Sequence, residues 1–361
     1  MKIAILGTRG VPNNYGGFEQ FAQYLSEGLV QRGHKVFVYN SHNHPYRCSV
    51  WNGVNIIHCN DPEQTIGTFG QFIYDFNCIL DTRRREFDAI LQLGYTSSSI
   101  WNWLIRKDKM TLITNMDGME WRRSKYSYFV RCFLRYAESL AIKYSDILIS
   151  DSKGIQSYLK DKYNVDSKYI PYGSHVSDVE DDHVLDKFNL IRNQYAMIVS
   201  RMEPENNIEM ILSGFITSDT NKKMVVVGNM DTRYGRYIRS RFIDDRIIYL
   251  GYINDIQVLN SLRFYSYIYF HGHSVGGTNP SLLEAIGSHA LICAHDNLFN
   301  RDVLGNNSLY FLSSDDVVRI LNRDHIEERE RFVSEGIDNL RNIYSWKNIV
   351  SSYEHMFLSC L

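Results

Sequence analysis

The chain has 361 residues, which predicts two domains at roughly 150 residues per domain. Hydrophobic residues make up 44% and charged residues 22%, so each half can bury a core and extensive disorder is excluded. The net charge is 39 basic minus 41 acidic residues, or −2. This balance argues against a general nucleic-acid binder, because such a protein needs a basic surface to displace counterions.

The cysteine pattern and the amino terminus both bear on the cellular compartment. The six cysteines are scattered, with no CxxC pair and no histidine at zinc spacing. This predicts a reduced, cytoplasmic protein. No apolar run approaches the ~20 residues that span a bilayer, and Arg9 comes too early for the apolar region of a signal peptide. We therefore expect the protein to stay on the cytosolic side of the membrane.

The first half of the chain alternates between expected strands and helices. Residues 2–6 form an apolar run, followed by a glycine-rich loop and a helix with an apolar face, which Gly33 ends before a strand at 35–39. This is a β-α-β unit. Further apolar runs follow at 89–93, 112–114 and 147–150. The spacing predicts a doubly wound, Rossmann-like domain over residues 1–174.

A polar, acidic stretch at 174–188 marks the expected domain boundary. Strands are then expected at 195–200, 224–228, 247–250, 267–270 and 290–294, with helices at 207–215 and 280–287. They predict a second Rossmann-like domain over residues 190–343. Residues 344–361 carry apolar side chains at helical spacing and predict a helix that crosses back to the first domain. Because ligands bind outside the carboxyl ends of parallel strands, we expect the active site in a cleft between the domains.

The loop of residues 7–17 is the first candidate for binding an anion. Its glycines follow a strand and precede a helix, where backbone amides and the helix dipole favour negative charge. Its spacing fits neither GxGxxG nor GxxxxGK[ST], so a NAD site or a Walker loop has no direct support. The alternative is a tight connection whose glycines only satisfy backbone sterics, with Glu19 capping the helix.

The segment HGHSVGGTNPSLLEA, residues 271–285, is the second candidate. Asn279 suits an N-cap and Pro280 the first helical position, which predicts another anion-binding helix start. Glu284 follows about one turn later among apolar residues, where a carboxylate can accept hydrogen bonds from ribose hydroxyls. The alternative is an acid on a solvated helix face. His271 and His273 fit loop or core histidines better than metal ligands.

Arg201 in SRMEPENN is the third candidate. It follows the first expected strand of the second domain, where a guanidinium could grip a diphosphate with paired hydrogen bonds.

The three loops together resemble the GT-B nucleotide-sugar glycosyltransferases, specifically glycosyltransferase family four. The resemblance covers nearly the whole chain, through GGFE, the IPYG turn, SRMEPENN, the Gly228 loop, LGYIND and PSLLEA in that order. GTRGVPNNYGGFE, NMDGMEWRR and HGHSVGGTNPSLLEA are most similar to a bacterial branch that includes rhamnosyltransferases of surface-polysaccharide assembly, such as capsule and O-antigen. The resemblance therefore implies a GT-B enzyme that takes dTDP-L-rhamnose as donor and needs no cofactor. It also implies that the first domain lies on the acceptor side and that the second binds the nucleotide sugar.

The resemblance also implies roles for individual residues. Asp117, Glu120 and Arg201 would be catalytic. The donor would be bound by Arg9, Gly16, Gly17, Asn206, His273, Gly276, Gly277, Thr278, Asn279 and Glu284. Arg201 would pair with the diphosphate, and Glu284 would hold the 3′-hydroxyl of the nucleoside sugar. Asp117 and Glu120 would orient the acceptor hydroxyl or the transferred sugar, the alternative being a turn whose aspartate caps a helix.

Two positions depart from the broad family pattern. The usual acid eight residues before Glu284 is Gly276, and the usual lysine after the glutamate of SRMEPEN is Asn206. Arg201, Arg9 and the two helix amino termini would then carry more of the leaving-group stabilisation. No DxD-type pair stands out in a strand-end loop, which predicts metal-independent transfer. Family-four enzymes retain the anomeric configuration, so we expect retention here by resemblance.

Residues 121–144 form a basic, aromatic segment. They include six basic residues, one acidic residue and seven aromatic residues. A helix of this kind can lie on anionic lipid, which suggests peripheral attachment to the inner membrane and an undecaprenyl-diphosphate-linked saccharide as acceptor. The alternative is a core-packed helix with a solvated basic face.

Two other functions stay open. Gly276 and Asn206 also fit a catalytically inactive GT-B scaffold that binds nucleotide sugars without turnover. A nucleotide-sugar epimerase would release an altered sugar without needing an acceptor. An oxidoreductase is disfavoured because the dinucleotide fingerprint is missing.

Overall fold

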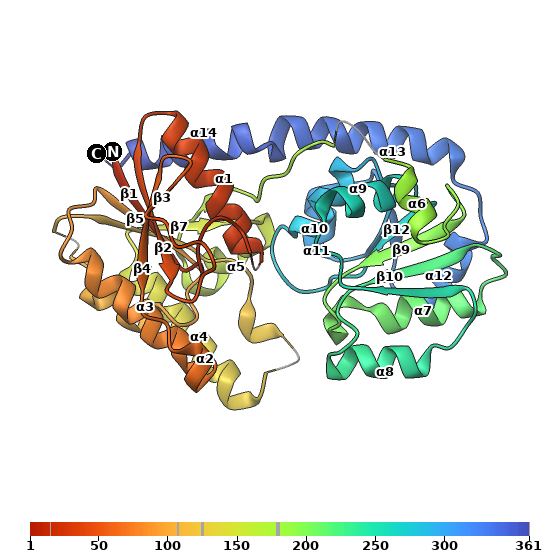
Figure 1. Ribbon diagram of the computed structural model, residues 1–361, viewed down its shortest axis with the longest axis horizontal. Helices are drawn as coiled ribbons and strands as arrows, with labels where there is room; N and C mark the ends of the chain where they lie inside the picture. The colour runs from red at the N-terminus through yellow and green to blue at the C-terminus, as the bar shows by residue number, and fades with distance from the viewer. Residues whose placement is uncertain (15, 107, 124–125, 178–180, 361) are drawn as a thin grey trace. The chain divides into compact units, whose positions relative to one another are not determined.

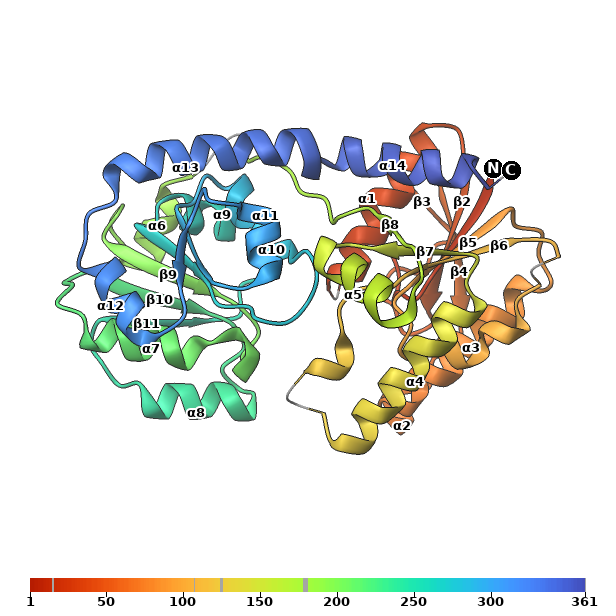
Figure 2. The same ribbon diagram turned by 180° about the vertical axis from the view of Figure 1, so that it is seen from behind.

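The computed structural model describes residues 1–14, 16–106, 108–123, 126–177 and 181–360 (Figures 1 and 2). Parts of four segments discussed above lie outside the described residues. They are Tyr15 of the first glycine-rich loop, Ser124 and Lys125 of the basic aromatic segment, residues 178–180 of the acidic stretch, and Leu361 of the last helix.

The chain divides into two compact units. Unit 1 comprises Met1–Gly173 and Trp346–Leu361, and unit 2 comprises Ser174–Ser345. In each unit helices cover both faces of one mainly parallel sheet (Figure 1). The α/β class with two parallel-sheet domains, predicted from the sequence, is confirmed.

Unit 1 is built on an eight-stranded sheet of order β3-β4-β2-β1-β5-β6-β7-β8, in which only β3 pairs antiparallel. Its elements are β1 (Lys2–Leu6), α1 (Gly17–Gln31), β2 (Lys35–Ser41), β3 (Val50–Trp51), β4 (Val54–Cys59), α2 (Glu63–Ile66), α3 (Phe69–Thr82), β5 (Ala89–Leu93), η1 (Ser99–Leu104), β6 (Thr111–Asn115), η2 (Glu120–Arg122), α4 (Tyr128–Tyr144), β7 (Ile147–Ser150), α5 (Lys153–Tyr163), β8 (Lys168–Tyr169) and α14 (Trp346–Leu358). β5 is buried throughout, as expected of a parallel strand covered on both faces.

The last helix, α14, packs on α1 within unit 1. The ring of Phe21 lies 5.3 Å from that of Tyr353 and 5.8 Å from that of Trp346. Arg32 at the end of α1 forms an ion pair with Glu354 at 2.6 Å. A Cβ on Gly28 would come within 2.6 Å of Val350, so glycine lets the two helices approach closely. The apolar spacing noted from Trp346 to Phe357 is therefore the spacing of a buried helix face.

Unit 2 is built on a six-stranded parallel sheet of order β11-β10-β9-β12-β13-β14. Its elements are α6 (His183–Lys187), β9 (Tyr195–Val199), η3 (Pro204–Asn206), α7 (Ile208–Thr217), β10 (Lys223–Val227), α8 (Arg233–Arg241), β11 (Ile247–Gly251), α9 (Ile256–Phe264), β12 (Ile268–His271), α10 (Pro280–Gly287), β13 (Ile292–His295), α11 (Leu298–Leu304), β14 (Leu309–Phe311), α12 (Ser314–Leu321), α13 (Ile326–Asn339) and the π-helical turn η4 (Leu340–Tyr344). Fully buried Phe215, Phe270 and Phe311 lie in one core between this sheet and α7 and α12.

Among the described residues, no helix combines the length and the apolar character that crossing a bilayer requires. All six cysteines are free thiols, and three of them, Cys59, Cys78 and Cys293, are buried.

Candidate functional site

The strand order of unit 2 identifies where a ligand would bind. The first strand of this sheet is β9. The next two strands, β10 and β11, lie on one side of it, and the last three, β12 to β14, lie on the other side. The order therefore reverses between β9 and β12, and in doubly wound sheets ligands bind outside the carboxyl ends of strands at such a point. The two loops that leave this point are residues 200–207 and 272–279.

These two loops are joined by hydrogen bonds and by close backbone packing. The amide and hydroxyl of Ser274 both donate to the carbonyl oxygen of Glu205, at 3.1 and 2.8 Å. The side chain of Asn207 donates to the carbonyl oxygen of Gly272 at 2.8 Å. A Cβ on Gly272 would lie only 2.0 Å from the carbonyl oxygen of Asn206. Glycine at position 272 is thus a packing requirement, because any side chain would push the loops apart.

Arg201 and Asn206 belong to one closed turn. The side-chain amide of Asn206 donates to the carbonyl oxygen of Arg201 at 2.7 Å, and Asn206 is 4% exposed. The side chain of Arg201 itself is exposed. Asn206, predicted to bind donor, therefore uses its amide nitrogen to shape the loop that presents Arg201.

The amino end of α10 has the cap that the sequence predicted. The side-chain oxygen of Asn279 accepts hydrogen bonds from the amide of Ser281 at 3.0 Å and from its hydroxyl at 2.9 Å, and Pro280 is the first helical residue. Gly276 has φ of +134°, and a Cβ there would meet no atom of the described residues within 4 Å. The backbone before α10 is therefore open on this side. Gly277 is half-buried, whereas Thr278 is 5% exposed.

Glu284 is anchored by an arginine that the sequence analysis did not identify. Its side chain is 20% exposed, and its Oε2 accepts a hydrogen bond from Nη2 of Arg263 at 2.9 Å. Arg263, on α9, is 1% exposed and also donates to the side-chain oxygen of Asn260 at 3.2 Å. A buried guanidinium is costly unless it is paired, so the pair fixes the carboxylate in one orientation.

His271 and His273 stack on each other, with ring centroids 4.3 Å apart and planes at 16°. His271 is 1% exposed, and neither ring nitrogen finds a hydrogen-bond partner among the described residues. Burial, together with the nearby His273 and Arg263, holds the pKa of His271 well below its usual value, so the ring is neutral. His271 is thus a core histidine that supports the half-buried His273 beside the loop of residues 274–279.

In unit 1 the strand order reverses between β1 and β5, and the first glycine-rich loop leaves this point. A Cβ on Gly7 would lie 2.1 Å from the carbonyl oxygen of Leu93, so the loop packs directly against β5. Glu19 is 4% exposed and accepts hydrogen bonds from the hydroxyl of Thr8 at 3.2 Å and from the amide of Arg9 at 2.8 Å. It braces this loop, while α1 begins after Gly16 without a side-chain cap.

Arg9 already has a carboxylate partner. Its guanidinium donates to both oxygens of Glu63, at 3.1 Å from Nε to Oε2 and 2.7 Å from Nη2 to Oε1, and Gln71 donates to the same carboxylate at 2.8 Å. Burial opposes ionisation of Glu63, but the hydrogen bonds from Arg9 and Gln71 outweigh it and lower its pKa. A diphosphate at Arg9 would therefore compete with Glu63. Gly16 is half-buried, and Gly17 is exposed and accepts a hydrogen bond from Tyr172.

Asp117 and Glu120 lie in the loop that follows β6. Asp117 has φ of +47°, and its amide donates to the side-chain oxygen of Asn115 at 3.0 Å. The next short helix, η2, has Met119 at its N-cap, so Asp117 does not cap it. The carboxylate of Glu120 pairs with Nε of Arg123 at 2.7 Å.

The predicted site residues therefore fall into separate groups. In unit 2, the two joined loops and the first turn of α10 bring together Arg201, Asn206, His273, Gly276, Gly277, Thr278, Asn279 and Glu284. In unit 1, Arg9, Gly16 and Gly17 follow β1, whereas Asp117 and Glu120 follow β6, which is separated from β1 by β5.

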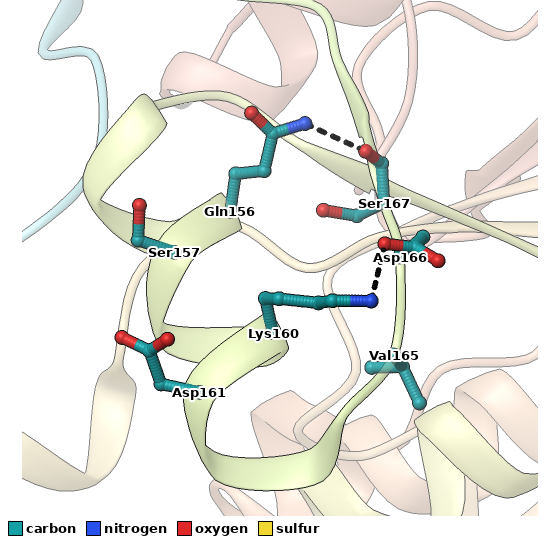
Figure 3. A pocket seen from close by; sticks show the side chains of 7 residues that line it. All are labelled: Gln156, Ser157, Lys160, Asp161, Val165, Asp166 and Ser167. Atoms are coloured by element: carbon teal, nitrogen blue, oxygen red, sulfur yellow. Dashed lines mark hydrogen bonds and ion pairs between the residues drawn. The ribbon is translucent and has the colours of Figure 1, made fainter.

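Two further features carry no predicted site residue. In unit 1, α5 and the segment before β8 line a cavity of about 360 Å³ (Figure 3). Two interactions link its polar lining, since Lys160 pairs with Asp166 at 2.9 Å and Gln156 donates to the carbonyl oxygen of Ser167 at 2.7 Å. Within the described residues, the group with metal-ligand spacing is the exposed set Asp181, Asp182 and His183.

The comparison with solved structures identifies the fold, whereas the family and curated comparisons do not. Residues 1–175 match a family model described as a domain of unknown function, DUF1972. No curated protein matches the chain. Among solved structures, sucrose-phosphate synthase from Thermosynechococcus elongatus superposes with a TM-score of 0.81 at 13% identity, over 99% of this chain and 98% of that one. HepE of Anabaena in complex with UDP and glucose gives 0.76 at 16% identity, over 100% of both chains.

A glycosyltransferase from Rickettsia africae gives a TM-score of 0.70 at 11% identity, over 99% of this chain and 98% of that one. Identities this low show the fold alone. The chain has the GT-B fold that its sequence predicted.

A buried acid near the first glycine-rich loop makes stability depend on pH. Asp75, on α3, is 6% exposed and accepts a hydrogen bond from the hydroxyl of Ser97 at 2.6 Å. Burial raises its pKa from 3.8 to about 7, although Ser97 and the charge of Arg9 act in the opposite direction. Between these two pKa values the folded chain holds a proton that the unfolded chain has released, so stability falls as pH rises from about 4 to about 7.

We predict that Asp75→Asn removes the fall in stability between about pH 4 and pH 7. An amide keeps the acceptor for Ser97 without a charge to desolvate, so the variant should be the more stable protein above pH 7, by on the order of 3 kcal/mol. Urea unfolding at pH 5, 6, 7 and 8 measures the effect. Parallel stability curves for the variant and the wild type would contradict it.

Proposed function

We propose that the protein is a retaining, metal-independent glycosyltransferase that transfers a sugar from a nucleotide sugar to a lipid-linked saccharide in surface-polysaccharide assembly. The favoured donor is dTDP-L-rhamnose. One observation carries the proposal. At the chain reversal of unit 2, two hydrogen-bonded loops hold an exposed arginine, an open glycine turn and a capped helix start beside an anchored glutamate.

The diphosphate of the donor would bind at the amino end of α10. The helix dipole favours negative charge there. The amide of Ser281 is already bonded to the side chain of Asn279, so the backbone amides for the diphosphate would come from the loop before the helix. Gly276 leaves the approach open because it has no side chain. Arg201 would add paired, charge-assisted hydrogen bonds from the neighbouring loop. These groups stabilise the charge that grows on the leaving nucleoside diphosphate.

Glu284 would bind the sugar of the nucleoside. The buried Arg263 holds one carboxylate oxygen, so the carboxylate is oriented before a ligand arrives. In a dTDP donor the 3′-hydroxyl is the only free hydroxyl of that sugar. HepE was solved with UDP and with UDP-glucose, so UDP sugars are the main competing donors.

In the transfer step, the acceptor oxygen would bond to the anomeric carbon as that carbon's bond to the phosphate oxygen breaks. The acceptor proton would pass to the leaving phosphate on the same face, which retains the configuration. Asp117 and Glu120 of unit 1 would orient the acceptor hydroxyl or the sugar. Support for retention and for rhamnose comes from the resemblance to the rhamnosyltransferase-like branch.

Exposed aromatic side chains on unit 1 support a membrane-bound acceptor at the cytoplasmic face. Tyr128 and Phe129 on the first turn of α4 are 74% and 83% exposed, and Phe69 on the first turn of α3 is 76% exposed. An edge-to-face contact between Phe72 and Phe133, with ring centroids 5.6 Å apart, joins α3 and α4. Both views place the first turn of α4 near α2 and the start of α3 (Figures 1 and 2). The opposite face of α4 is buried and includes Leu134, Ala137 and Ala141. The helix is thus core-packed on one side and exposes aromatic and basic residues on the other, as an interfacial helix does.

An inactive scaffold is the second candidate function. Two observations favour it. The guanidinium of Arg9 is already paired with Glu63, and the side-chain amide of Asn206 is already bonded to the carbonyl oxygen of Arg201, so fewer hydrogen-bond donors remain for a diphosphate.

We expect purified protein to release nucleoside diphosphate from dTDP-rhamnose when a lipid extract supplies acceptor. Glu284→Gln should lower kcat/KM at least tenfold, roughly 1.4 kcal/mol or more, because an amide cannot accept as a carboxylate does. Glutamine is preferred to alanine because alanine would leave Arg263 buried without a partner. Glu209→Gln, which breaks the pair of Glu209 with Arg241 on the surface of unit 2, is the matched control.

A panel of nucleotide sugars, tested as donors, separates the transferase from the scaffold and the epimerase. It contains dTDP-rhamnose, UDP-glucose and a fucose donor. Binding without turnover on any donor would favour the scaffold, and release of a free altered sugar without acceptor would favour an epimerase. Wild-type kinetics of Glu284→Gln would contradict the role of Glu284.

We also expect the protein to float with vesicles that contain anionic lipid at moderate salt. Phe129→Ser should reduce the bound fraction severalfold, because burying a phenyl ring in the interface contributes about 1.5–3 kcal/mol. Ile243→Ser is the matched control, since Ile243 in unit 2 is equally exposed at 83%. Absence of wild-type flotation, or equal losses in the two variants, would remove the membrane proposal.

A further inference from the structure

Glu138, on α4, accepts hydrogen bonds from five side chains of the described residues although it is 2% exposed. The donors belong to the loop after β5, to η2 and to α5. They are Tyr95 at 3.4 Å, Trp121 at 3.1 Å, Tyr158 at 2.7 Å, Lys162 at 3.2 Å and Tyr163 at 2.6 Å. A buried carboxylate needs such donors to replace its water shell. One acid therefore joins segments from across unit 1.

Lys162 balances the charge of this buried acid. Burial alone would lower the pKa of Lys162, but its hydrogen bonds to the tyrosines and the charge of Glu138 raise it, so the amine stays protonated. Removing the negative charge would leave the amine partly buried without its counter-ion. The carboxylate at position 138 therefore supplies a counter-charge as well as a hydrogen-bond acceptor.

Trp121 is held in place by Glu138 and by neighbouring cations. Its indole N–H donates to Oε2 of Glu138. Among the described residues, three cations lie over its ring. They are Arg135 at 4.5 Å, Lys162 at 5.2 Å and Arg122 at 5.3 Å from the ring centroid. Such contacts favour one orientation of the indole. Trp121 is the residue after Glu120, so fixing its ring fixes the end of the loop that carries Asp117 and Glu120.

The other end of this loop is tied to the sheet and to the last helix. Asn115, the final residue of β6, accepts the amide of Asp117 and donates to the hydroxyl of Tyr353 on α14 at 3.4 Å. Between the two ends, the hydroxyl of Tyr95 lies 3.5 Å from the carbonyl oxygen of Gly118. Asp117, with its positive φ, is therefore set between two anchors, and Glu138 supplies one of them.

We propose that Glu138 is a positioning residue that holds the Asp117–Glu120 loop in the conformation used for sugar transfer. The part of this inference that concerns transfer rests on the proposed function. Because Arg201, the start of α10 and Glu284, proposed above to bind the diphosphate and the nucleoside, lie in unit 2, loosening this loop should lower kcat and leave the donor KM nearly unchanged.

The test compares Glu138→Gln with Tyr163→Phe. The first keeps the size of the side chain but removes its charge and places an N–H₂ group among donors. The second removes one donor and leaves the bond between Trp121 and Glu138. Two measurements report on the loop without any substrate. The first is hydrogen exchange of the backbone amides of residues 116–123. The second is the fluorescence emission of Trp121, identified as the part of the tryptophan emission that is lost in Trp121→Phe.

We expect Glu138→Gln to speed this exchange at least about tenfold, to shift the emission of Trp121 to longer wavelength, and to lower kcat at least about tenfold with donor KM within about twofold. Tyr163→Phe should stay near wild type in all three measurements. Glu138→Asp, which restores the charge, should recover part of kcat.

Unchanged exchange in Glu138→Gln would overturn the anchoring role, and faster exchange with unchanged kcat would overturn the positioning role. If no donor supports turnover in the wild type, the proposed function fails, and the exchange measurement alone decides whether Glu138 anchors the loop. If Glu138→Gln does not fold, Trp121→Phe breaks the same tie, and normal exchange and kcat in that variant would refute the proposal.

Discussion

The close contact between Gly272 and Asn206 is the constraint on which the candidate site depends. It brings the loops after β9 and β12 together at the point where the sheet of unit 2 reverses its order. Arg201 is presented by one loop, and the Gly276 turn and the cap of α10 belong to the other. Without this contact, the groups proposed to bind a diphosphate would not share one location.

Each unit fixes a candidate carboxylate segment through an ion pair of which one partner is buried. In unit 2, Arg263 orients Glu284 from below the surface, and in unit 1, Glu138 with Lys162 anchors the loop of Asp117 and Glu120. A buried pair does little for net stability, yet it penalises any alternative conformation that would separate the charges. Both ion pairs therefore fix the orientation of nearby groups. Sugar transfer needs such fixed groups, because they must stabilise a short-lived charged transition state.

The sequence predicted those parts of the molecule that depend on local patterns. Apolar runs located β1 and β7 to the residue, and the Asn-Pro pair located the start of α10, because strand burial and helix capping leave signals within a few residues. The half-buried β4 lacks a continuous apolar run and was not anticipated. The pairing of Arg9 with Glu63, 54 residues away, and the roles of Arg263 and Glu138 arise from tertiary packing, which leaves no such local pattern.

The affinity of a Gly272→Ala variant for dTDP and UDP, measured by isothermal titration calorimetry, tests the central claim most directly. Its Cβ would overlap the carbonyl oxygen of Asn206, whereas Gly336→Ala on α13 meets only an ordinary contact with Ile286. Asn207→Ala removes a hydrogen bond between the same loops. We predict that Gly272→Ala weakens nucleotide binding at least about tenfold, that Asn207→Ala weakens it less, and that Gly336→Ala binds as wild type does. Wild-type affinity in folded Gly272→Ala would contradict the account.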